Sequence, residues 1–527
     1  MFFGCPNLSV QRGGAKARWD AIKKSECGIG RVSVRFIIME KTMSDYHFSK
    51  SRYCCGVQCP RMLWLKENMP GEYDAGAENQ AVFATGNEVG GLAMGLFGDY
   101  TEVPHSESLS DMILETQRLL DDGAGNVCEA SFSHDGCFCS VDILRNLGGK
   151  KVELYEVKSS TEVKDVYKHD VSYQHYVLTK LGFDVRKVCL VHINNQYVRH
   201  GALELDKLFA IEDLTAVAKG KLGEVERNIA KFRECLAQEA EPERKVGAQC
   251  SDPYPCGFWA HCAVDMPRDG TPTVWDVANL RNKQSYYDNG YITFAQLYGA
   301  GVLAGKQLQQ VEVELKDLPP QIDAKSIAVF LGTLSYPLYF LDFETFNPAI
   351  PLYDGSSPYQ QIVFQYSLHY IEKEGGELRH KECLAYPGSD PRRQIAEQLC
   401  RDIPRDVCTV AYNMGFEKGQ IRGLADLCPD LRDHLMNIQG NIKDIMIPFQ
   451  KRWYYTKEMR GSYSIKAVLP ALFPDEPSLD YHNLKGVHNG GEASSTFLAM
   501  LNMGKRRNWK NGGSIFCATA SLTPSPW

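Results

Sequence analysis

The sequence lacks a hydrophobic run long enough to cross a membrane, because no stretch approaches the ~18 consecutive apolar residues that a spanning helix needs. Its first residues also lack the order of basic, apolar and small residues that forms a secretory signal. These absences argue against a membrane protein and against an exported one. We therefore expect a cytoplasmic protein without a membrane partner.

Positive charge is not in excess either. The chain has 58 Lys and Arg against 65 Asp and Glu, which gives a net charge of -7 at pH 7. This balance excludes a protein that binds nucleic acid over most of its surface, so any such contact must be local. It does not exclude a nuclease, because the active site of a metal-dependent nuclease itself holds acidic ligands.

Length and composition are ordinary for a globular protein. With 527 residues, 44% of them hydrophobic, the chain is long enough for two or three domains with their own cores. Its 18 cysteines should be mostly reduced in the absence of an export signal, so clustered cysteines are candidate metal ligands. The isolated Cys189, Cys383 and Cys408 are expected to be small buried hydrophobic residues.

Two short apolar runs on either side of a Gly-Gly pair, Asn146 to Gly149, predict a β-hairpin. The first strand carries Asp142, and the second carries Glu156 and Lys158. Since side chains two apart in a strand share a face, Glu156 and Lys158 project together, and pairing can bring Asp142 to the same face. Two carboxylates bind Mg²⁺ or Mn²⁺ with waters left over, and a lysine can orient or deprotonate such a water. A solvated hairpin face is the alternative.

Four cysteines form a second pattern. Cys59 precedes Pro60, which suits the first turn of a helix, and Cys250, Cys256 and Cys262 follow at even spacing among turn residues. Three thiols in a loop, with a fourth far upstream, can close a tetrahedral metal site or hold a cubane cluster. A zinc ion is the alternative to an iron-sulfur cluster at these four cysteines. The alternative to any metal site is a set of unrelated buried cysteines.

The order of these motifs resembles that of RecB-like PD-(D/E)XK nucleases with an iron-sulfur cluster, a group that includes CRISPR-associated exonucleases. The likeness covers residues 47–265 and rests on Cys-Pro-Arg, the Asp, the Glu-x-Lys, a following Gln and the three evenly spaced cysteines. It implies a [4Fe-4S] cluster that ties the two ends of the domain together. The implied ligands are Cys59, Cys250, Cys256 and Cys262, with Cys54 or Cys55 as replacements for Cys59.

The same resemblance assigns roles around the hairpin. It implies that Asp142 and Glu156 are metal ligands and that Lys158 is the catalytic lysine. Gln174 falls where the group has a glutamine on a helix packed against the site, with an exposed helix position as the alternative.

One position departs from the relatives. They carry a histidine as a further metal ligand in an upstream Gly-x-x-x-His motif, where this chain has Gly86 and Gly90. Glu88 is a candidate replacement, and a surface position is its alternative.

Apolar residues at helical spacing predict a long amphipathic helix over residues 205–245, which returns the chain to the cysteines. Short connecting helices are expected next, with a domain boundary near residue 325.

A second acidic pattern opens the C-terminal half. Residues 336–346 predict a buried strand that carries Asp342 and Glu344 two apart, on one face. This Asp-x-Glu resembles the first motif of DnaQ-like exonucleases of the ribonuclease H fold, where both carboxylates hold two metal ions. Asn413-Met-Gly-Phe-Glu417 is similar to the second motif of that family, with Glu in place of Asp. Asp444 follows where such domains place another acid, and a helix-capping role is its alternative.

The two halves together resemble the family called domain of unknown function 2779, over residues 47–500. The likeness includes the segments 461–470 and 489–493, and residues 361–370 add a second strand before a Gly-Gly turn. It implies an α/β fold in which a PD-(D/E)XK nuclease core precedes a ribonuclease H-like mixed-sheet domain. We expect an uncertain extension at 1–46, the nuclease domain at 47–265, a helical connector at 266–330, the exonuclease domain at 331–504 and an aberrant tail at 505–527.

The tail departs from that family, whose last helix carries an Asp that completes the metal site. This chain ends without a helical pattern, and one permitted codon set for Ser521 to Trp527 encodes Pro-Asp-Thr-Leu-Ala-Met in another frame. We therefore expect a frameshift and a second site that lacks its final carboxylate. Glu492 and His488 are candidate partial substitutes.

The sequence thus predicts a Mg²⁺- or Mn²⁺-dependent deoxyribonuclease that hydrolyses phosphodiesters. Single-stranded DNA ends are the expected substrate, because the relatives prefer them. The alternative is a catalytically decayed protein that binds nucleic acid or serves as a scaffold.

Overall fold

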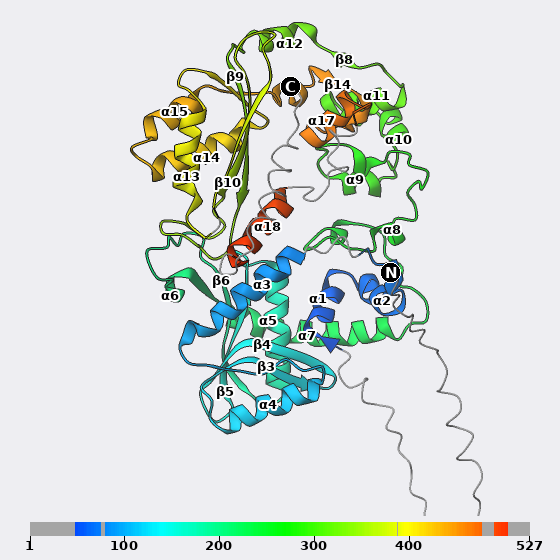
Figure 1. The fold of residues 1–527 in the computed structure, drawn as a ribbon. Coiled ribbons are helices and arrows are strands. Elements are labelled where there is room, and N and C mark those ends of the chain that lie inside the picture. Colours follow the sequence, from blue (N-terminus) through cyan, green and yellow to red (C-terminus); the bar gives the residue numbers. More distant parts are fainter. Residues whose placement is uncertain (1–47, 75–79, 387, 477–489, 504–527) are drawn as a thin grey trace, which may run out of the picture.

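The computed structural model describes residues 48–74, 80–386, 388–476 and 490–503 (Figure 1). In these ranges the chain forms a mixed α/β fold, as the sequence predicts. The expected N-terminal extension and the aberrant tail lie outside the described residues. Among the helices within these ranges, none has the length and continuous hydrophobicity needed to cross a membrane.

The first sheet is built from residues 48–213. Its strands run in the order β2, β3, β4, β5, β6, β7, and β1 pairs with β4. Their bounds are β1 (Phe48–Ser49), β2 (Thr101–Glu102), β3 (Asn126–His134), β4 (Cys137–Asn146), β5 (Lys151–Lys158), β6 (Asp184–Ile193) and β7 (Phe209–Asp213). Since β5 lies between β4 and β6 and is covered on both faces, six consecutive residues of it are buried.

The predicted hairpin is confirmed. β4 and β5 are antiparallel, with Ile143 opposite Tyr155 and Leu144 opposite Leu154. Leu154 belongs to the core that the helices cover on one face of the sheet, and Tyr155 belongs to the core on the other face. The alternation of strand side chains therefore directs Glu156 toward the same face as Leu154.

The helices on that face include α1 (Lys50–Gln58), α4 (Leu109–Asp121), α5 (Asp165–Lys180) and α7 (Thr215–Leu236). α5 is buried on nearly all sides, as expected for a helix packed between a sheet and other helices. α1 approaches α7 so closely that a Cβ atom on Gly56 would lie 2.8 Å from the ring of Phe232. Glycine is therefore required at this crossing.

The long helix predicted over residues 205–245 is wrong in its extent. Only α7 is helical over most of that range, while residues 205–208 form the short α6 (Leu205–Leu208) and residues 209–213 form β7. β7 pairs with β6 along the edge of the sheet. Pairing satisfies the backbone hydrogen-bonding groups of this segment, and helical spacing in the sequence does not report such a distant partner.

Residues 266–330, the segment expected to be a helical connector, contain several short helices and do not stand alone. Val313 packs against Tyr455 and Val468 from the C-terminal part of the chain, and β8 (Gln321–Ile322) pairs with β14 (Tyr454–Tyr455). The connector and residues 447–472 therefore form one packed unit, at the right of Figure 1. Its helices are η5 (Val274–Asp276), α9 (Lys283–Asp288), α10 (Phe294–Gly299), α11 (Gly305–Leu315), α12 (Ala324–Leu331), α16 (Ile447–Gln450), η6 (Lys457–Met459) and α17 (Ile465–Leu472).

The second sheet is mixed, with its strands in the order β11, β10, β9, β12, β13. Its strands are β9 (Leu338–Phe346), β10 (Ile362–Ile371), β11 (Arg379–Leu384), β12 (Cys408–Ala411) and β13 (Ile442–Asp444). The strands predicted over residues 336–346 and 361–370, and the third after the Gly-Gly turn, are confirmed. Because β9, β12 and β13 are parallel, their carboxyl ends meet at one edge of the sheet.

Helices cover both faces of the second sheet. α13 (Pro391–Asp402), α14 (Met414–Leu427) and α15 (Arg432–Gly440) contribute to the core on one face. On the other face, α18 (Gly490–Met503) packs its Phe497 ring against Phe346 and Phe364. β9 is thus held between two layers of helices.

The loop after β9 joins the two sheets. Ala349 and Ile350 are buried in the same core as Tyr155, on the face of the first sheet opposite α5. Nη1 of Arg199 donates hydrogen bonds to the backbone carbonyls of Pro351 (2.9 Å) and Leu352 (3.0 Å). Apolar burial and charged hydrogen bonds together hold the second domain against the first.

Replacing Ile350 with alanine should therefore destabilise the docked protein. Removal of a buried isoleucine side chain costs about 2–5 kcal/mol, because the packed atoms leave a cavity. Urea unfolding of Ile350→Ala should show a lower midpoint than the parent protein. Ile322→Ala is the matched control, since Ile322 is 57% exposed and should change stability by less than about 0.5 kcal/mol. Equal midpoints for the two variants would contradict the docking.

Candidate functional site

Glu156 is the centre of a polar cluster beneath α5. Its Oε1 accepts hydrogen bonds from Nζ of Lys158 (2.6 Å) and Nζ of Lys50 (2.7 Å). Its Oε2 accepts a hydrogen bond from Nε2 of Gln174 (2.7 Å). Glu156 is 1% exposed and Gln174 is fully buried, so this face of the hairpin is not a solvated surface, and Gln174 is not an exposed helix residue.

Asp142 reaches the same cluster through a different contact. Its Oδ2 accepts a hydrogen bond from the backbone amide of Val157 at 2.6 Å. The Asp142 carboxylate also interacts electrostatically with Glu156, Lys50 and Lys158. The structure therefore brings Asp142 and Glu156 together on one side of the hairpin.

Three charged residues of this cluster were not predicted from the sequence. Lys50 begins α1, directly after its N-cap Ser49. Asp170 lies one turn before Gln174 on α5 and accepts hydrogen bonds from Gln174 (2.9 Å) and Lys158 (2.7 Å). Glu129 comes from β3, where its backbone has a φ of 55°, and it interacts electrostatically with Lys50. The four-residue spacing of Asp170 and Gln174 is a signal that the sequence did contain.

Two lysines offset part of the charge of the four acids in this cluster. Burial and Asp142 oppose ionisation of Glu156, but the attraction of Lys158 and Lys50 outweighs them and lowers its pKa. Burial likewise opposes the charge on Lys50, yet Asp170 and Glu156 raise its pKa. Burial raises the pKa of Asp142, although Lys50 and Lys158 act against that shift. Two lysines therefore hold Glu156 in its ionised form.

A second group of carboxylates lies at the edge where β9, β12 and β13 end. Asp342 and Glu344 project from β9 on the same face, Asp444 ends β13, and Glu417 lies in the first turn of α14. Asp342 interacts electrostatically with Glu344 and Glu417, and Asp444 does so with Glu417. The structure therefore brings together the four acids that the sequence named for the second domain.

These four acids differ in their hydrogen bonding. Oδ1 of Asp444 accepts from the backbone amides of Asn413 and Met446, each at 3.0 Å, so this acid also caps the chain around two helix starts. Glu417 is 3% exposed, and its Oε2 is buried without a hydrogen-bond partner within the described residues. A carboxyl group in that position is therefore stabilised either by protonation or, when it is ionised, by a nearby cation.

The pKa values of this group are raised. Burial raises the pKa of Asp342 to about 6, even though its side chain keeps exposed surface at the sheet edge. Burial and the neighbouring Asp342 raise the pKa of Glu344 to about 7, against the attraction of Lys466. Burial, with Asp342 and Asp444 nearby, raises the pKa of Glu417 to about 8. Repulsion between like charges is thus only weakly compensated here, in contrast to the cluster around Glu156.

The four predicted cysteine ligands line one small cavity. Cys59, Cys250, Cys256 and Cys262 surround a space of about 10 Å³, roughly the room of one water molecule. All four carry free thiols, and burial raises the pKa of Cys262 to about 11 while Arg61 opposes this shift. The two ends of the domain therefore bring these four cysteines to the lining of one cavity.

Helix α1 connects the cysteine cavity to the Glu156 cluster. Lys50 lies at its first residue, and Cys59 is its C-cap. Nε2 of Gln58 donates hydrogen bonds to the carbonyls of Gln249 (2.8 Å) and Tyr254 (2.7 Å), which flank Cys250. The loop that carries three thiols is therefore fixed to the helix that carries Lys50.

Other predicted positions fall outside these groups. Glu88 is exposed and Gly90 is half-buried, both on α3 (Gln80–Ala93). His488 lies outside the described residues, as does the side chain of Glu492. Within the described ranges, no group of three or more His, Cys, Asp or Glu side chains is placed so that it could hold a metal ion. The isolated Cys189, Cys383 and Cys408 are buried, as predicted.

Comparison with known families bears on the second domain. Residues 339–464 match the family described as "Domain of unknown function (DUF2779)". This segment begins within β9 and contains Asp342, Glu344, Glu417 and Asp444. The likeness therefore covers the acidic edge of the second sheet.

Three mycoplasma-group proteins are also similar to the chain. "Uncharacterized protein MG366" of Mycoplasma genitalium is 25% identical over 185 residues, which are 32% of this chain and 28% of that protein. "Uncharacterized protein UU173" of Ureaplasma parvum is 24% identical over 172 residues, 30% of this chain and 24% of that protein. The Mycoplasma pneumoniae homolog of MG366 is 28% identical over 187 residues, 32% of this chain and 28% of that protein. The chain thus spans about a quarter of the length of these curated relatives. No solved structure matches it significantly.

The raised pKa values at the second site predict how stability depends on pH. Carboxyl groups of the unfolded chain titrate near pH 4, whereas Glu417 in the fold titrates at about 8. The folded state therefore holds extra protons between about pH 4 and 8, so its stability should be greatest below that window and fall as the pH rises through it. Thermal unfolding in EDTA should show this loss, and Mg²⁺ or Mn²⁺ at pH 8 should reverse it.

Glu417→Gln should flatten the pH dependence and remove the response to the cation. Glu382→Gln is the control, because Glu382 is exposed on β11 and should leave both unchanged. A parent protein whose melting temperature rises between pH 5 and 8 relative to Glu417→Gln would contradict this prediction.

Proposed function

We propose that this protein is a Mg²⁺- or Mn²⁺-dependent nuclease that hydrolyses DNA phosphodiesters at single-stranded ends. The observation that carries the proposal is the edge of the second sheet, where Asp342, Glu344, Glu417 and Asp444 converge and Oε2 of Glu417 is buried without a partner. Divalent metal ions with oxygen ligands satisfy such a group of acids. The mixed sheet around it agrees with the ribonuclease H-like expectation from the sequence.

The donor set at this edge fits a hard divalent cation. Carboxylate oxygens are the ligands that Mg²⁺ and Mn²⁺ prefer, and the uncompensated repulsion among these acids favours a bound cation. Such an ion supplies charge stabilisation at the scissile phosphate and an activated water. Asp342 and Glu344 on β9 and Glu417 on α14 would hold it, and Asp444 would support them from its capping position.

The Glu156 cluster supports a second nuclease centre in the first domain. Asp142 and Glu156 would be its metal ligands, and Lys158 would orient a water molecule or neutralise a phosphate oxygen. Gln174 and Asp170 fix the positions of Glu156 and Lys158 through hydrogen bonds of 2.7–2.9 Å. A cation at Glu156 has to compete with Lys50, which already contacts Oε1.

We further propose that Cys59, Cys250, Cys256 and Cys262 hold a [4Fe-4S] cluster. The convergence of four thiols on one cavity supports a tetrathiolate site. Arg61 and Arg244 also line this cavity, and their positive charge acts against the burial that raises the pKa of Cys250. Zinc fits the same four ligands, so metal content decides between them.

One observation favours the alternative of a nucleic-acid-binding protein without catalysis. Two lysines neutralise Glu156, so the first site is stable without any metal ion. In that case the cluster would be structural, and only the second domain or neither would cleave DNA.

Cleavage should depend on both sites. Labelled single-stranded DNA with Mg²⁺ or Mn²⁺ should be degraded by the parent protein and left intact in EDTA. Lys158→Ala and Asp342→Asn should each reduce the rate, and the double variant should lose on the order of 100-fold or more, because each removes a group that acts on charge or protons at the phosphate.

Lys164→Ala is the matched control, since Lys164 is an exposed lysine near the same hairpin and should retain full activity. DNA binding should persist in the double variant. A parent protein that binds single-stranded DNA but never cleaves it with either metal would establish the alternative.

The cluster is tested by metal analysis after anaerobic purification. The parent protein should be coloured and contain about four iron and four sulfide per chain. Cys256→Ser should lose most of this iron because one ligand is missing, whereas Cys400→Ser, a half-buried cysteine on α13, should keep it. A colourless protein with one zinc per chain would contradict the iron-sulfur assignment.

A further inference from the structure

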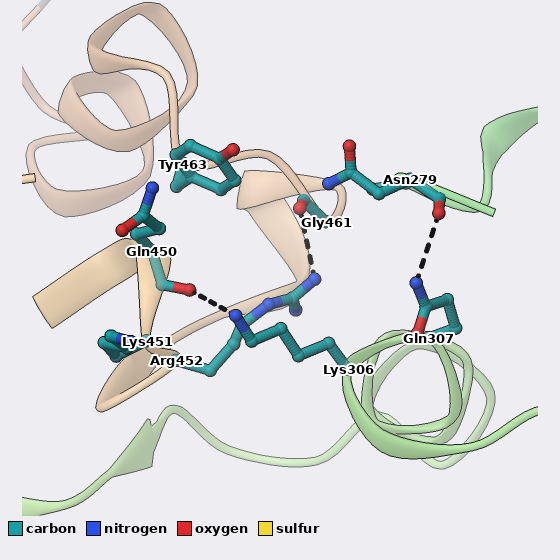
Figure 2. Close-up of a pocket in the computed structure, with 9 residues that line it drawn as sticks. Asn279, Lys306, Gln307, Gln450, Lys451, Arg452, Gly461 and Tyr463 are labelled. Carbon is teal, nitrogen blue, oxygen red and sulfur yellow. Dashed lines mark hydrogen bonds between the residues drawn. The ribbon is translucent and has the colours of Figure 1, made fainter. Parts of the chain in front are cut away.

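A pocket whose lining includes no member of either acidic group opens between the connector and the C-terminal part of the chain. Its volume is about 290 Å³, near the low end of the roughly 300–1,000 Å³ found for small-ligand sites. Helix α11 forms one wall, and the segment that follows α16 forms the other (Figure 2). The side chains that line it are Asn279, Lys306, Gln307, Gln450, Lys451, Arg452 and Tyr463.

The lining of this pocket carries positive charge that no acid compensates. Three of its side chains are cationic, namely Lys306, Lys451 and Arg452, and none of its lining residues is acidic. Within the described part of the chain, none of these three cations forms an ion pair with a carboxylate, although many other Lys and Arg side chains do. A chain with a net charge of -7 thus concentrates unpaired positive charge in one concave site.

Arg452 lines this pocket and keeps one donor without a partner. Its Nη2 donates a hydrogen bond to the Gly461 carbonyl (3.1 Å), and its guanidinium lies 3.8 Å from the ring centre of Tyr455. Its Nη1 is buried without a hydrogen-bond partner within the described residues. A buried, unpaired N–H donor is costly unless a ligand satisfies it.

Lys306 and two amides complete the arrangement. Nζ of Lys306 donates a hydrogen bond to the Gln450 carbonyl (2.7 Å), and Figure 2 shows this side chain reaching from α11 across to α16. Nε2 of Gln307 donates to the Asn279 carbonyl (3.3 Å). The ammonium of Lys306 retains further donors for an anion, because a lysine carries three N–H groups.

The frame around the pocket is rigid. Gly461 has a φ of 77°, and a Cβ atom there would lie 2.4 Å from Oε1 of Gln310. Gln310 is buried, accepts a hydrogen bond from the amide of Ala278 (2.9 Å) and donates one to the carbonyl of Asp276 (2.9 Å). Only glycine fits at position 461, so the loop that accepts from Arg452 has a fixed position.

The pocket is also connected to the acidic edge of the second sheet. The hydroxyl of Tyr412 donates a hydrogen bond to the carbonyl of Tyr463 (2.6 Å). Tyr412 precedes Asn413, whose amide binds Asp444. One hydrogen bond and one peptide link therefore join the lining residue Tyr463 to the chain that contacts Asp444.

We propose that this pocket binds a phosphate group of a nucleic-acid strand. A fork of guanidinium N–H groups and two ammonium groups match phosphate oxygens, and the amides and the tyrosine ring suit the attached sugar and base. A free nucleotide presents the same phosphate chemistry, so the experiment has an arm for each source. This inference concerns binding alone and does not depend on hydrolysis at either acidic site.

The test uses the full chain in EDTA, where no cleavage occurs. Fluorescence anisotropy measures binding of a labelled single-stranded oligonucleotide, and calorimetry measures binding of inorganic phosphate and of deoxyadenosine monophosphate. Lys306→Gln and Lys451→Gln should each weaken oligonucleotide binding by about three- to ten-fold and lower the salt dependence by roughly one ion per lysine. Lys231→Gln, an exposed lysine on α7, should bind as the parent protein does.

Arg452→Lys should weaken binding further than either glutamine variant. Although this variant keeps the positive charge, it loses the planar set of N–H donors that can bind two phosphate oxygens at once. If this variant does not fold, the Lys306→Gln and Lys451→Gln variants still test the proposal, because both lysines are exposed. Calorimetry that detects binding of deoxyadenosine monophosphate to the parent protein but not to the lysine variants would support phosphate recognition and assign it to a free nucleotide. Unchanged binding of both probes in Lys306→Gln and Lys451→Gln would overturn the proposal. A parent protein that binds the oligonucleotide but does not cleave it when Mg²⁺ or Mn²⁺ is added would reject only the nuclease function.

Discussion

Compensation of buried negative charge is the constraint on which this structure depends. Carboxylates placed close together repel one another, and burial strengthens that repulsion. The first domain resolves it internally, since Lys50, Lys158 and Gln174 satisfy both oxygens of Glu156. The second domain does not, since Glu417 keeps a buried oxygen without a partner within the described residues and the neighbouring acids have raised pKa values. The two sites therefore differ in what they require from solution: the first is complete as a salt-bridged cluster, and the second calls for a proton or a cation.

The first domain couples its polar cluster to its cysteines through one short helix. α1 begins at Lys50 and ends before Cys59, and its passage over α7 depends on the absence of a side chain at Gly56. The nine residues of this helix thus join Cys59 to Lys50, the lysine that contacts Glu156, so a displacement of Cys59 would also move Lys50. A metal centre at the thiols would fix this helix, which gives a physical reason for a structural cluster in a domain whose reactive groups lie elsewhere.

The connector has a larger role than the joining of two domains. Its helices share a core with residues 447–472. None of the residues that line the basic pocket of this unit is acidic. Positive charge in an otherwise acidic protein is therefore concentrated in one pocket, which Tyr412 links to the chain around Asp444. Under the proposed binding function, this pocket would attract a polyanion that the acids alone would repel.

The sequence by itself determined the parts that depend on local periodicity. Alternation along one strand places Glu156 with Lys158 and Asp342 with Glu344, and Pro60 marks the start of α2 (Pro60–Asn68), because these features need only neighbouring residues. The tertiary structure alone decided which distant groups join them. Lys50, Asp170 and Glu129 reach the first cluster through helix packing and strand pairing, and β7 replaces a helix because β6 offers it backbone partners. The pocket around Arg452 likewise arises from two segments more than a hundred residues apart, whose contact no local pattern encodes.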